Sequence, residues 1–495
     1  MPASFPNILW VCTDQQRYDT LGCTGNPHVA TPHIDRLAAE GVLFENAFCQ
    51  NPLCTPSRGS FLTGRYPTTN RLTRNGQVCP PDLRIFPRDL REAGYVNGLI
   101  GKLHLNACDN RFALGPDWER TDQRLWFKGV ERRIDDGYDI FLWDHHPTAE
   151  NPASSYTQWL WEKTGGHIPP TPPHPASAFI RQGRPAALSQ TTWAAEQAVR
   201  FIASYRDRLH PWLLSVNLFD PHPPFDAPET HLARYLDRLD SLPPVNYVDG
   251  ELDTAPPHHR AFFEGQPFTY GGQHARMTAR DHQLVRASYY AMVDLIDEQL
   301  GRIFAALDAT GQRENTLIIF MSDHGELLGD HGLWPKGPFL YDPALRVPLI
   351  FSWPGRLAAG RRVSGLVELT DLVPTLRDLL KLAPDPAVQG QSFAPTLLGN
   401  GPVDALREDV YAQYPNSNPH RTPLFLDMIR TRTHKLIACH GTHDGELYDL
   451  VADPGENRNR WADPAYATIK TELLVRLAGR MAMTVDPMPP RVGVF

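Results

Sequence analysis

The stretch ILWVCTDQ, residues 8–15, joins an uninterrupted apolar run to an aspartate and a glutamine. Short apolar runs of the same β-type recur at 96–100, 212–218, 317–321 and 347–351, and amphipathic helical stretches lie between them. This alternation is typical of mostly parallel strands with helices on both sides of the sheet. The sequence therefore predicts an α/β fold in which helices sandwich a large mixed, mostly parallel sheet.

The helical stretches and a change of character near residue 399 divide the chain. Helices are predicted at 31–41, where Thr31 can cap and Pro32 suits the first turn, and at 191–205 and 281–307. Beyond 399, short strand-like pieces at 424–429 and 435–438 precede a helix at 465–481. We expect a large domain at 1–398 and a smaller C-terminal α+β subdomain, a short antiparallel sheet plus a helix, at 399–495. The Pro-, Gly- and aromatic-rich ranges 109–190 and 221–273 are expected to be insertion loops that wall a pocket.

Composition excludes several classes of protein. The chain has 495 residues and a formal net charge of −8, with its basic residues scattered, so nucleic acid is not an expected partner. No run approaches the ~20 apolar residues of a membrane-spanning helix. The first residues carry no signal-peptide pattern, so we expect a soluble cytoplasmic protein without a membrane partner. Seven cysteines at irregular spacing indicate neither a disulfide framework nor a zinc knuckle.

Polar residues follow three of the predicted strands. Asp14-Gln15 follows the first, Asp220-Pro221-His222 the third, and Asp323-His324 the fourth. Ligands of an open parallel sheet gather outside the carboxyl ends of its strands. Two carboxylates, an amide oxygen and an imidazole there would make a site for one divalent cation. Taken alone, either aspartate is equally well a turn or cap residue, and it is their shared placement that favours the metal site.

The segment LCTPSRG at 53–59, followed by FLTGR at 61–65, carries the strongest signal. A polar residue and then a proline indicate a helix start, which places Cys54 at the positive end of a helix dipole, where an anionic substrate is favoured. The alternative is a buried structural cysteine, the more frequent role of a free cysteine.

The residues around Cys54 decide between these two interpretations. Cys-x-Pro-x-Arg at 54–58 resembles the sequence that formylglycine-generating enzymes recognise in type I sulfatases, members of the alkaline phosphatase superfamily, where the cysteine is oxidised to an aldehyde. The resemblance covers most of the chain, in the family's order. It continues through GYVNGLIGKLH at 94–104, DPHPPF at 220–225, SDHGE at 322–326, GDHGLWPKG at 329–337, ELYDL at 446–450 and DPGEN at 453–457.

The resemblance implies a role for each matching residue. An alkaline-phosphatase-like catalytic domain at 1–398 would carry the site, and the C-terminal subdomain would contribute to its rim. The metal would be held by Asp14, Gln15, Asp323, His324 and an oxygen of the formylglycine formed from Cys54. The remaining catalytic residues would be Arg58, Lys102, His104, His222 and Lys336.

The family's mechanism follows from these roles. By this resemblance, the cation would lower the pKa of one hydroxyl of the hydrated formylglycine, which would attack sulfur in line. Arg58 and Lys102 would stabilise the hydrate and the sulfate charge, while His222 and Lys336 would bind sulfate and help to protonate the leaving group. His104 would take a proton from the second hydroxyl, so that sulfate is expelled and the aldehyde is restored. Taken singly, each of these side chains is more often a solvated or loop residue. Their coincidence at motif positions favours the functional interpretation.

Two positions depart from the commonest pattern of the family, in which three aspartates and an asparagine hold the metal. Here Gln15 and His324 replace two of them, which reduces the negative charge of the site and softens it slightly, so calcium is no longer the automatic choice. Calcium is still expected first, and manganese second. The same two residues also occur in phosphonate monoester hydrolases, relatives that use formylglycine but lack the lysine and histidine found here as Lys102 and His104. Sulfate ester hydrolysis is therefore the expected activity, and phosphonate monoester or phosphodiester hydrolysis is the alternative.

A third hypothesis is a non-catalytic sulfoglycan-binding protein, which is disfavoured because no residue of the implied site is missing. The organic part of the sulfate ester stays open among aryl, sugar and alkyl groups, and so does a homo-oligomeric state. The tryptophans at positions 118, 126, 143, 159 and 161 could offer stacking surfaces for a ring or sugar in the organic part of the ester. Further candidates for the site's periphery are His331, His434 and Lys435. The pair His258-His259 is expected to lie on the surface.

Overall fold

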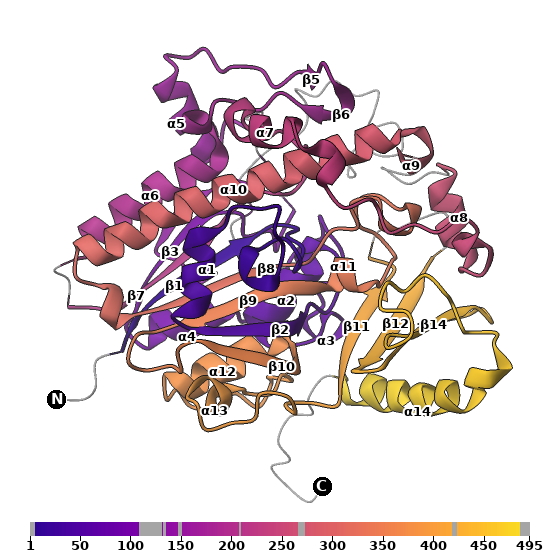
Figure 1. Ribbon diagram of the computed structural model, residues 1–495. Helices are drawn as coiled ribbons and strands as arrows, with labels where there is room; N and C mark the ends of the chain where they lie inside the picture. Colours follow the sequence, from indigo (N-terminus) through magenta and orange to yellow (C-terminus); the bar gives the residue numbers. More distant parts are fainter. Residues whose placement is uncertain are drawn as a thin grey trace, which may run out of the picture.

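A computed structural model describes residues 5–107, 131, 135–146, 151–206, 209–265, 273–417 and 423–485. At its centre lies an eight-stranded sheet in the order β10-β2-β9-β8-β1-β7-β3-β4 (Figure 1). The strands are β1 (Asn7–Thr13), β2 (Val42–Phe48), β3 (Val96–Gly101), β4 (Ile140–Trp143), β7 (Trp212–Asn217), β8 (Thr316–Ser322), β9 (Arg346–Ser352) and β10 (Arg361–Glu368).

The strands of this sheet are mostly parallel. β1 pairs in parallel with β7 and β8, β3 with β7 and β4, and β10 with β2. Within the described chain only β9 runs against its neighbours, β2 and β8. The carboxyl ends of the other strands therefore meet at one edge of the sheet. The predicted α/β class with a large, mostly parallel sheet is confirmed.

The apolar runs are continuous because both faces of the central strands are buried. Along β1, Ile8 and Trp10 pack into the hydrophobic cluster on one side of the sheet, and Leu9 and Val11 pack into the cluster on the other side. Successive side chains of a strand point to opposite faces, so a strand covered on both sides is apolar at every position.

Helices supply both covers (Figure 1). α10 packs against α1, α6 and α7 on one side, while α2 packs against α4 and α12 on the other. The long helix α10 begins with a capping box of Thr278 and Asp281. The predicted helices at 31–41, 191–205 and 281–307 correspond to α1, α6 and α10. The helices are α1 (Pro32–Ala39), α2 (Cys54–Thr63), α3 (Pro67–Asn70), α4 (Phe86–Glu92), α5 (Ser155–Lys163), α6 (Gln190–Ser204), α7 (Glu229–Leu236), α8 (Pro257–Phe263), α9 (Gln273–Arg276), α10 (Ala279–Ala309), α11 (Asp342–Leu345), α12 (Leu372–Leu379), α13 (Ala394–Leu397) and α14 (Ala467–Met483).

Three strands of the main sheet are absent from the sequence-based prediction. β2 and β10 were not predicted because polar residues, such as Glu45 and Asn46 in β2, interrupt their apolar pattern. β4 has four residues and sits at the sheet edge, where one side chain of the four is fully buried. It falls in the range 109–190, which also holds α5 and the hairpin of β5 (Pro173–His174) and β6 (Ser177–Arg181). This range therefore contributes to the sheet as well as forming loops.

The C-terminal part forms a second, antiparallel sheet in the order β11-β12-β13-β14. Its strands are β11 (Asp409–Pro415), β12 (Phe425–Thr431), β13 (His434–Cys439) and β14 (Gly445–Asp449). One face packs on Leu473 and Leu477 of α14, and the other contributes Met428 and Ile437 to the main core. The expected small sheet and helix are therefore present, while the boundary at residue 399 stays a prediction. None of the described helices combines the length and the apolar character needed to cross a membrane.

A buried ion cluster joins the small sheet to the main domain. Lys435 Nζ on β13 lies 2.5 Å from Asp342 at the start of α11 and 2.5 Å from Glu456. Arg430 Nη2 on β12 adds a contact of 3.0 Å to Asp342. Lys435 is fully buried and is the cationic partner of Glu456 in the described chain, whereas Asp342 shares its charge between Lys435 and Arg430.

We predict that Lys435→Met, which keeps the side-chain volume but removes the charge, lowers the free energy of unfolding by about 3–5 kcal/mol because it leaves the buried Glu456 carboxylate without its cationic partner. Urea denaturation measures this change. The control is Arg432→Gln at an exposed cation on the same hairpin, which should cost less than about 0.5 kcal/mol. A loss below about 1 kcal/mol in Lys435→Met would show that the cluster contributes little.

Candidate active site

A cavity of about 550 Å³ opens at the carboxyl edge of the main sheet. The loop after β1 brings Asp14 and Gln15 there, β3 leads into Lys102, and β8 leads into Asp323 and His324. α2 begins at Cys54, so the predicted helix start at this residue is correct. The sequence-predicted residues that line the cavity are Cys54, Lys102, His104, His222 and Lys336.

Cys54 lies buried at the N-terminus of α2, among charged side chains from distant parts of the chain. Its Sγ is 3.2 Å from Lys336 Nζ, 3.5 Å from Lys102 Nζ and 3.2 Å from His324 Nε2. Burial and the Asp14 carboxylate act to raise the pKa of the thiol, but the two lysines and His324 outweigh them and bring the pKa down to about 5. A negative charge at this position is therefore stabilised by the surrounding protein.

Arg58, one turn along α2 and fully buried, links this helix to two strand ends. Its Nε donates to Asp323 Oδ2 at 2.9 Å, and its Nη1 donates to the Lys102 carbonyl at 2.8 Å. Gly101 allows the end of β3 to lie close to the backbone at the end of β7. A Cβ at Gly101 would lie 2.0 Å from the carbonyl oxygen of Asn217, and the Asn217 side chain in turn donates to the Lys102 carbonyl at 2.7 Å.

Four side chains form a compact cluster of metal-ligand atoms. One ligand atom from each of Asp14, Cys54, Asp323 and His324 lies within 4.8 Å of all the others, and all four residues are buried. Burial acts to raise the pKa of the Asp14 carboxyl, yet the surrounding cations, led by Lys102, hold it well below its usual range. The Asp14 carboxylate would therefore be available as a hard oxygen ligand.

His324 and Gln15 are oriented as ligands would be. His324 Nδ1 lies 2.9 Å from the Gly325 carbonyl, which can only accept, so Nδ1 carries the proton and Nε2 faces the cluster. The Gln15 amide donates from Nε2 to Glu326, while its Oε1 accepts from Lys336 Nζ at 2.5 Å. Both partners fix the same orientation, with the amide oxygen toward the cluster. The described residues therefore fit a single divalent cation with mainly oxygen ligands and one imidazole.

His104 and His222 are neutral histidines at the cavity. Burial lowers the pKa of His104 well below its ordinary value, and Lys102 and Arg58 lower it further. Burial also lowers the pKa of His222 well below its ordinary value, and Lys336 lowers it further. The Pro223 carbonyl lies 2.6 Å from His222 Nδ1 and can only accept, so the neutral ring carries its proton on Nδ1 and leaves Nε2 bare.

Two site residues adopt left-handed backbone conformations that cost free energy for non-glycine residues. Gln15 has φ 68° and His104 has φ 57°. Such strain persists only where the surroundings fix the residue. Here Glu326 and Lys336 hold the Gln15 side chain, and the backbone N–H of His104 donates to Glu131. The sequence offers no sign of this strain, because neither position is occupied by glycine or asparagine.

Several contributors were missed by sequence reasoning. Glu326 was quoted only as part of a motif, yet it orients Gln15. Asn75 accepts from the Thr55 amide at 2.9 Å, next to the nucleophile position, and lines the cavity. His145 also lines it and lies edge-on to His104, with ring centroids 4.4 Å apart. Asparagine and histidine in loops of no recognised motif gave no signal that could have identified the last two.

The structure places other candidates away from this cavity. His331 is buried and stacks on Tyr341 at 3.7 Å, and Lys435 belongs to the ion cluster described above. The expectation of a surface position is wrong for His259, which is fully buried because its ring packs against Phe339 and Tyr341 and its Nε2 lies 3.4 Å from Glu446 on β14. His258 is partly buried, and its Nε2 lies 3.1 Å from the Pro338 carbonyl.

The described residues among the remaining peripheral candidates do not line the cavity. The His434 ring lies 2.9 Å from the adjacent Thr433 hydroxyl and meets the Tyr466 ring, with centroids 6.4 Å apart. Trp143 and Trp159 pack into the protein interior, and Trp161 is 61% exposed without lining the cavity. The other two tryptophans that the sequence singled out, at 118 and 126, lie outside the described residues.

The fold and the site together define a hydrolase of the alkaline phosphatase type, and comparisons with known proteins specify the family. Residues 6–382 match the Sulfatase family, and residues 329–482 match the family described as N-sulphoglucosamine sulphohydrolase, C-terminal. The uncharacterized sulfatase YidJ of Escherichia coli K12 is 30% identical over 97% of this chain and 88% of that protein. Iduronate 2-sulfatase of Mus musculus is 30% identical over 92% of this chain and 91% of that protein.

Among solved structures, the phosphonate monoester hydrolase of Agrobacterium radiobacter has a TM-score of 0.82 and 27% identity, covering 97% of this chain and 96% of that chain. The chain belongs to the sulfatase family of the alkaline phosphatase superfamily, as its motifs indicated. Its enzymatic class, a sulfuric ester hydrolase, follows from this membership.

We predict that Glu326→Gln lowers the affinity for a divalent cation about 10- to 100-fold, because a glutamine can present either oxygen or NH₂ to Gln15 and no longer fixes the direction of its amide. Calorimetric titration of Ca²⁺ and of Mn²⁺ measures the affinity, and Glu314→Gln at an exposed glutamate is the matched control. Unchanged affinity for both ions, in a variant with an unchanged melting temperature, would rule out this role of Glu326.

Proposed function

We propose that the protein hydrolyses a sulfate monoester to an alcohol or phenol and inorganic sulfate, with formylglycine at position 54 as the nucleophile. The observation that carries the proposal is the pair of ammonium groups at this position. Lys102 Nζ and Lys336 Nζ lie 3.5 Å and 3.2 Å from Cys54 Sγ and come from separate segments, the residue after β3 and the loop between β8 and α11. A sulfate group presented to this position would have its charge balanced by both lysines.

The metal would be held by Asp14, Gln15, Asp323 and His324, with an oxygen at position 54 as a further ligand. Calcium is the first choice and manganese the second, because the oxygen ligands outnumber the imidazole. When bound, the cation would lower the pKa of a hydroxyl at position 54 and neutralise the charge of the sulfate group. The oxidation of Cys54 requires a formylglycine-generating enzyme as a partner during maturation.

The two cavity histidines divide the proton transfers. His104 is neutral and has no hydrogen-bond partner for Nδ1 in the described chain, so it can accept a proton at position 54. His222 in its neutral form has a bare Nε2 and cannot donate. The negative charge of a bound sulfate ester favours its doubly protonated form, which can donate Nε2–H to the leaving ester oxygen.

Phosphonate monoester hydrolysis is the second candidate function. Gln15 and His324 at the metal favour it, and so does the likeness to the phosphonate monoester hydrolase of Agrobacterium radiobacter, at TM-score 0.82. Lys102 and His104 favour sulfate instead, because the resemblance implies that phosphonate monoester hydrolases lack this lysine and this histidine. A non-catalytic sulfoglycan-binding role is disfavoured, since every residue expected of the site is present in the chain.

We expect metal-replete protein, with formylglycine at position 54 verified by peptide mass, to turn over para-nitrophenyl sulfate at least about tenfold faster, in kcat/KM, than para-nitrophenyl phenylphosphonate. Cys54→Ala should lose about 10⁴-fold in kcat because it removes the nucleophile. Cys23→Ala, a partly buried cysteine outside the cavity, is the control. Faster turnover of the phosphonate would assign the second candidate function. Turnover that survives in Cys54→Ala would overturn both.

The pH dependence of the reaction follows from His104. Its pKa is lowered below the ordinary 6.5, so the neutral, proton-accepting form persists as the pH falls through that value. We therefore expect the acid limb of the kcat profile to lie below pH 6.5 in the metal-replete enzyme. An acid limb centred at or above 6.5, in buffers of constant ionic strength and metal concentration, would contradict a neutral His104 as the base.

A further inference from the structure

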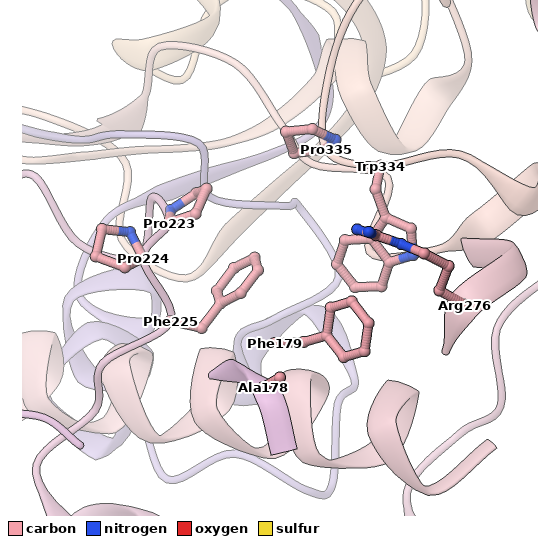
Figure 2. Close-up of a pocket in the computed structure, with 8 residues that line it drawn as sticks. All are labelled: Ala178, Phe179, Pro223, Pro224, Phe225, Arg276, Trp334 and Pro335. Carbon is pink, nitrogen blue, oxygen red and sulfur yellow. The ribbon is translucent and has the colours of Figure 1, made fainter. Parts of the chain in front are cut away.

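A second cavity, of about 390 Å³, lies beside the active-site cavity (Figure 2). Pro223 and Pro335 line both cavities. Each of these prolines is the chain neighbour of a residue at the sulfate position, His222 in one case and Lys336 in the other. The second cavity therefore begins where the proposed sulfate position ends, and a substrate longer than one ring would reach it past the two prolines.

Aromatic side chains form the walls of this second cavity. Phe225 and Trp334 meet edge to face, with ring centroids 6.1 Å apart, and Trp334 stacks on His282 at 5.7 Å. Phe179 on β6 completes the wall, and Figure 2 shows the three aromatic side chains gathered around one space. Trp334 and Phe225 are held by their own packing, so the wall is formed before any ligand arrives.

The two lining side chains that carry polar atoms, Arg276 and Trp334, are hydrogen-bond donors. Arg276, at the end of α9, is exposed, and its guanidinium makes no hydrogen bond or ion pair with another described residue. Figure 2 shows its side chain extending from α9 toward the aromatic residues. Trp334 Nε1 is buried and has no hydrogen-bond partner in the described chain. One cation and one N–H donor, set among rings, select a mostly apolar ligand that carries a negative group.

We infer that this cavity is a second subsite that binds the distal part of the sulfate ester, an aromatic ring bearing a carboxylate, and this inference rests on the proposed function. The ring stacks among Phe179, Phe225 and Trp334, and the carboxylate pairs with Arg276. A saccharide fits less well, because its hydroxyls need many donors and acceptors and the cavity's aromatic and proline walls offer few. The subsite gives the enzyme a preference for extended, anionic aryl sulfates.

The test compares two esters that differ at one group. The first is phenyl sulfate joined at its para position, through an oxymethylene link, to a para-benzoate ring, and the second carries a carboxamide in place of the carboxylate. Arg276→Gln is expected to raise KM for the carboxylate ester about tenfold, with kcat changed less than about twofold, because the carboxylate is remote from the ester bond. KM for the carboxamide ester should not change.

Two further variants locate the effect. Phe179→Ala is expected to raise KM for both esters several-fold, because it removes part of the ring-binding wall. Arg280→Gln, at an exposed arginine near the start of α10 that does not line the cavity, is the matched control and should change neither KM. Equal effects of Arg276→Gln on the two esters, or no effect on either, would overturn the subsite.

One-ring para-nitrophenyl sulfate separates failure of the subsite from failure of the proposed function. If it is turned over while Arg276→Gln treats the two long esters alike, the subsite is wrong and the proposed function stands. If no sulfate ester is turned over, the proposed function fails. Calorimetric binding of the carboxylate ester to Cys54→Ala and to the double variant with Arg276→Gln then decides the subsite. Weaker binding to the double variant supports it, and equal binding overturns it.

Discussion

The guanidinium of Arg58 is the contact on which the rest of the site depends. It is fully buried and reaches from the first turns of α2 to Asp323 after β8 and to the carbonyl of Lys102 after β3. A buried charge is tolerated only when it is paired and hydrogen-bonded, so these contacts fix three segments at once. These contacts fix the position of Cys54 relative to Asp323 and Lys102. Arg58 bonds directly to both of those residues, and Cys54 lies one turn before Arg58 on α2.

The local charge at the site is opposite in sign to that of the chain as a whole. The protein carries a formal net charge of −8, yet three cations, Arg58, Lys102 and Lys336, face two carboxylates around position 54. A divalent cation would add to this excess. The fold therefore creates an attraction for an anionic ester by bringing these cations together. The attraction acts at short range, in a buried cavity where the effective dielectric constant is low.

Two features of the site favour different ester classes, phosphonate in one case and sulfate in the other, and each concerns a different part of the site. Gln15 and His324 would set the charge of the proposed metal site, whereas Lys102 and His104 line the cavity at position 54. The aromatic cavity beyond Pro223 and Pro335 affects neither the metal site nor position 54, since it would hold the part of the substrate that does not react. Binding energy gained there can lower KM without changing the reacting groups, which separates substrate choice from reaction type.

The sequence alone determined the class of fold, the start of α2 at Cys54 and the set of strand-end residues that converge on it. These features are local. A strand buried on both faces is apolar at every position, and a proline after a polar residue marks a helix start, so each can be read within about ten residues. The weak strands β2, β4 and β10 were missed for the same reason, because polar positions or an edge location remove that local signature.

Only the tertiary structure decided how the site is held and what lies beside it. Glu326 orients Gln15 across 311 residues of sequence, and His104 meets His145 through two separate loops. His259 and His331 are buried packing residues, and nothing in the sequence indicates their burial. Three aromatic residues and Arg276 line a second cavity. Such contacts depend on how distant segments pack against each other, and no local pattern of residue types records that packing.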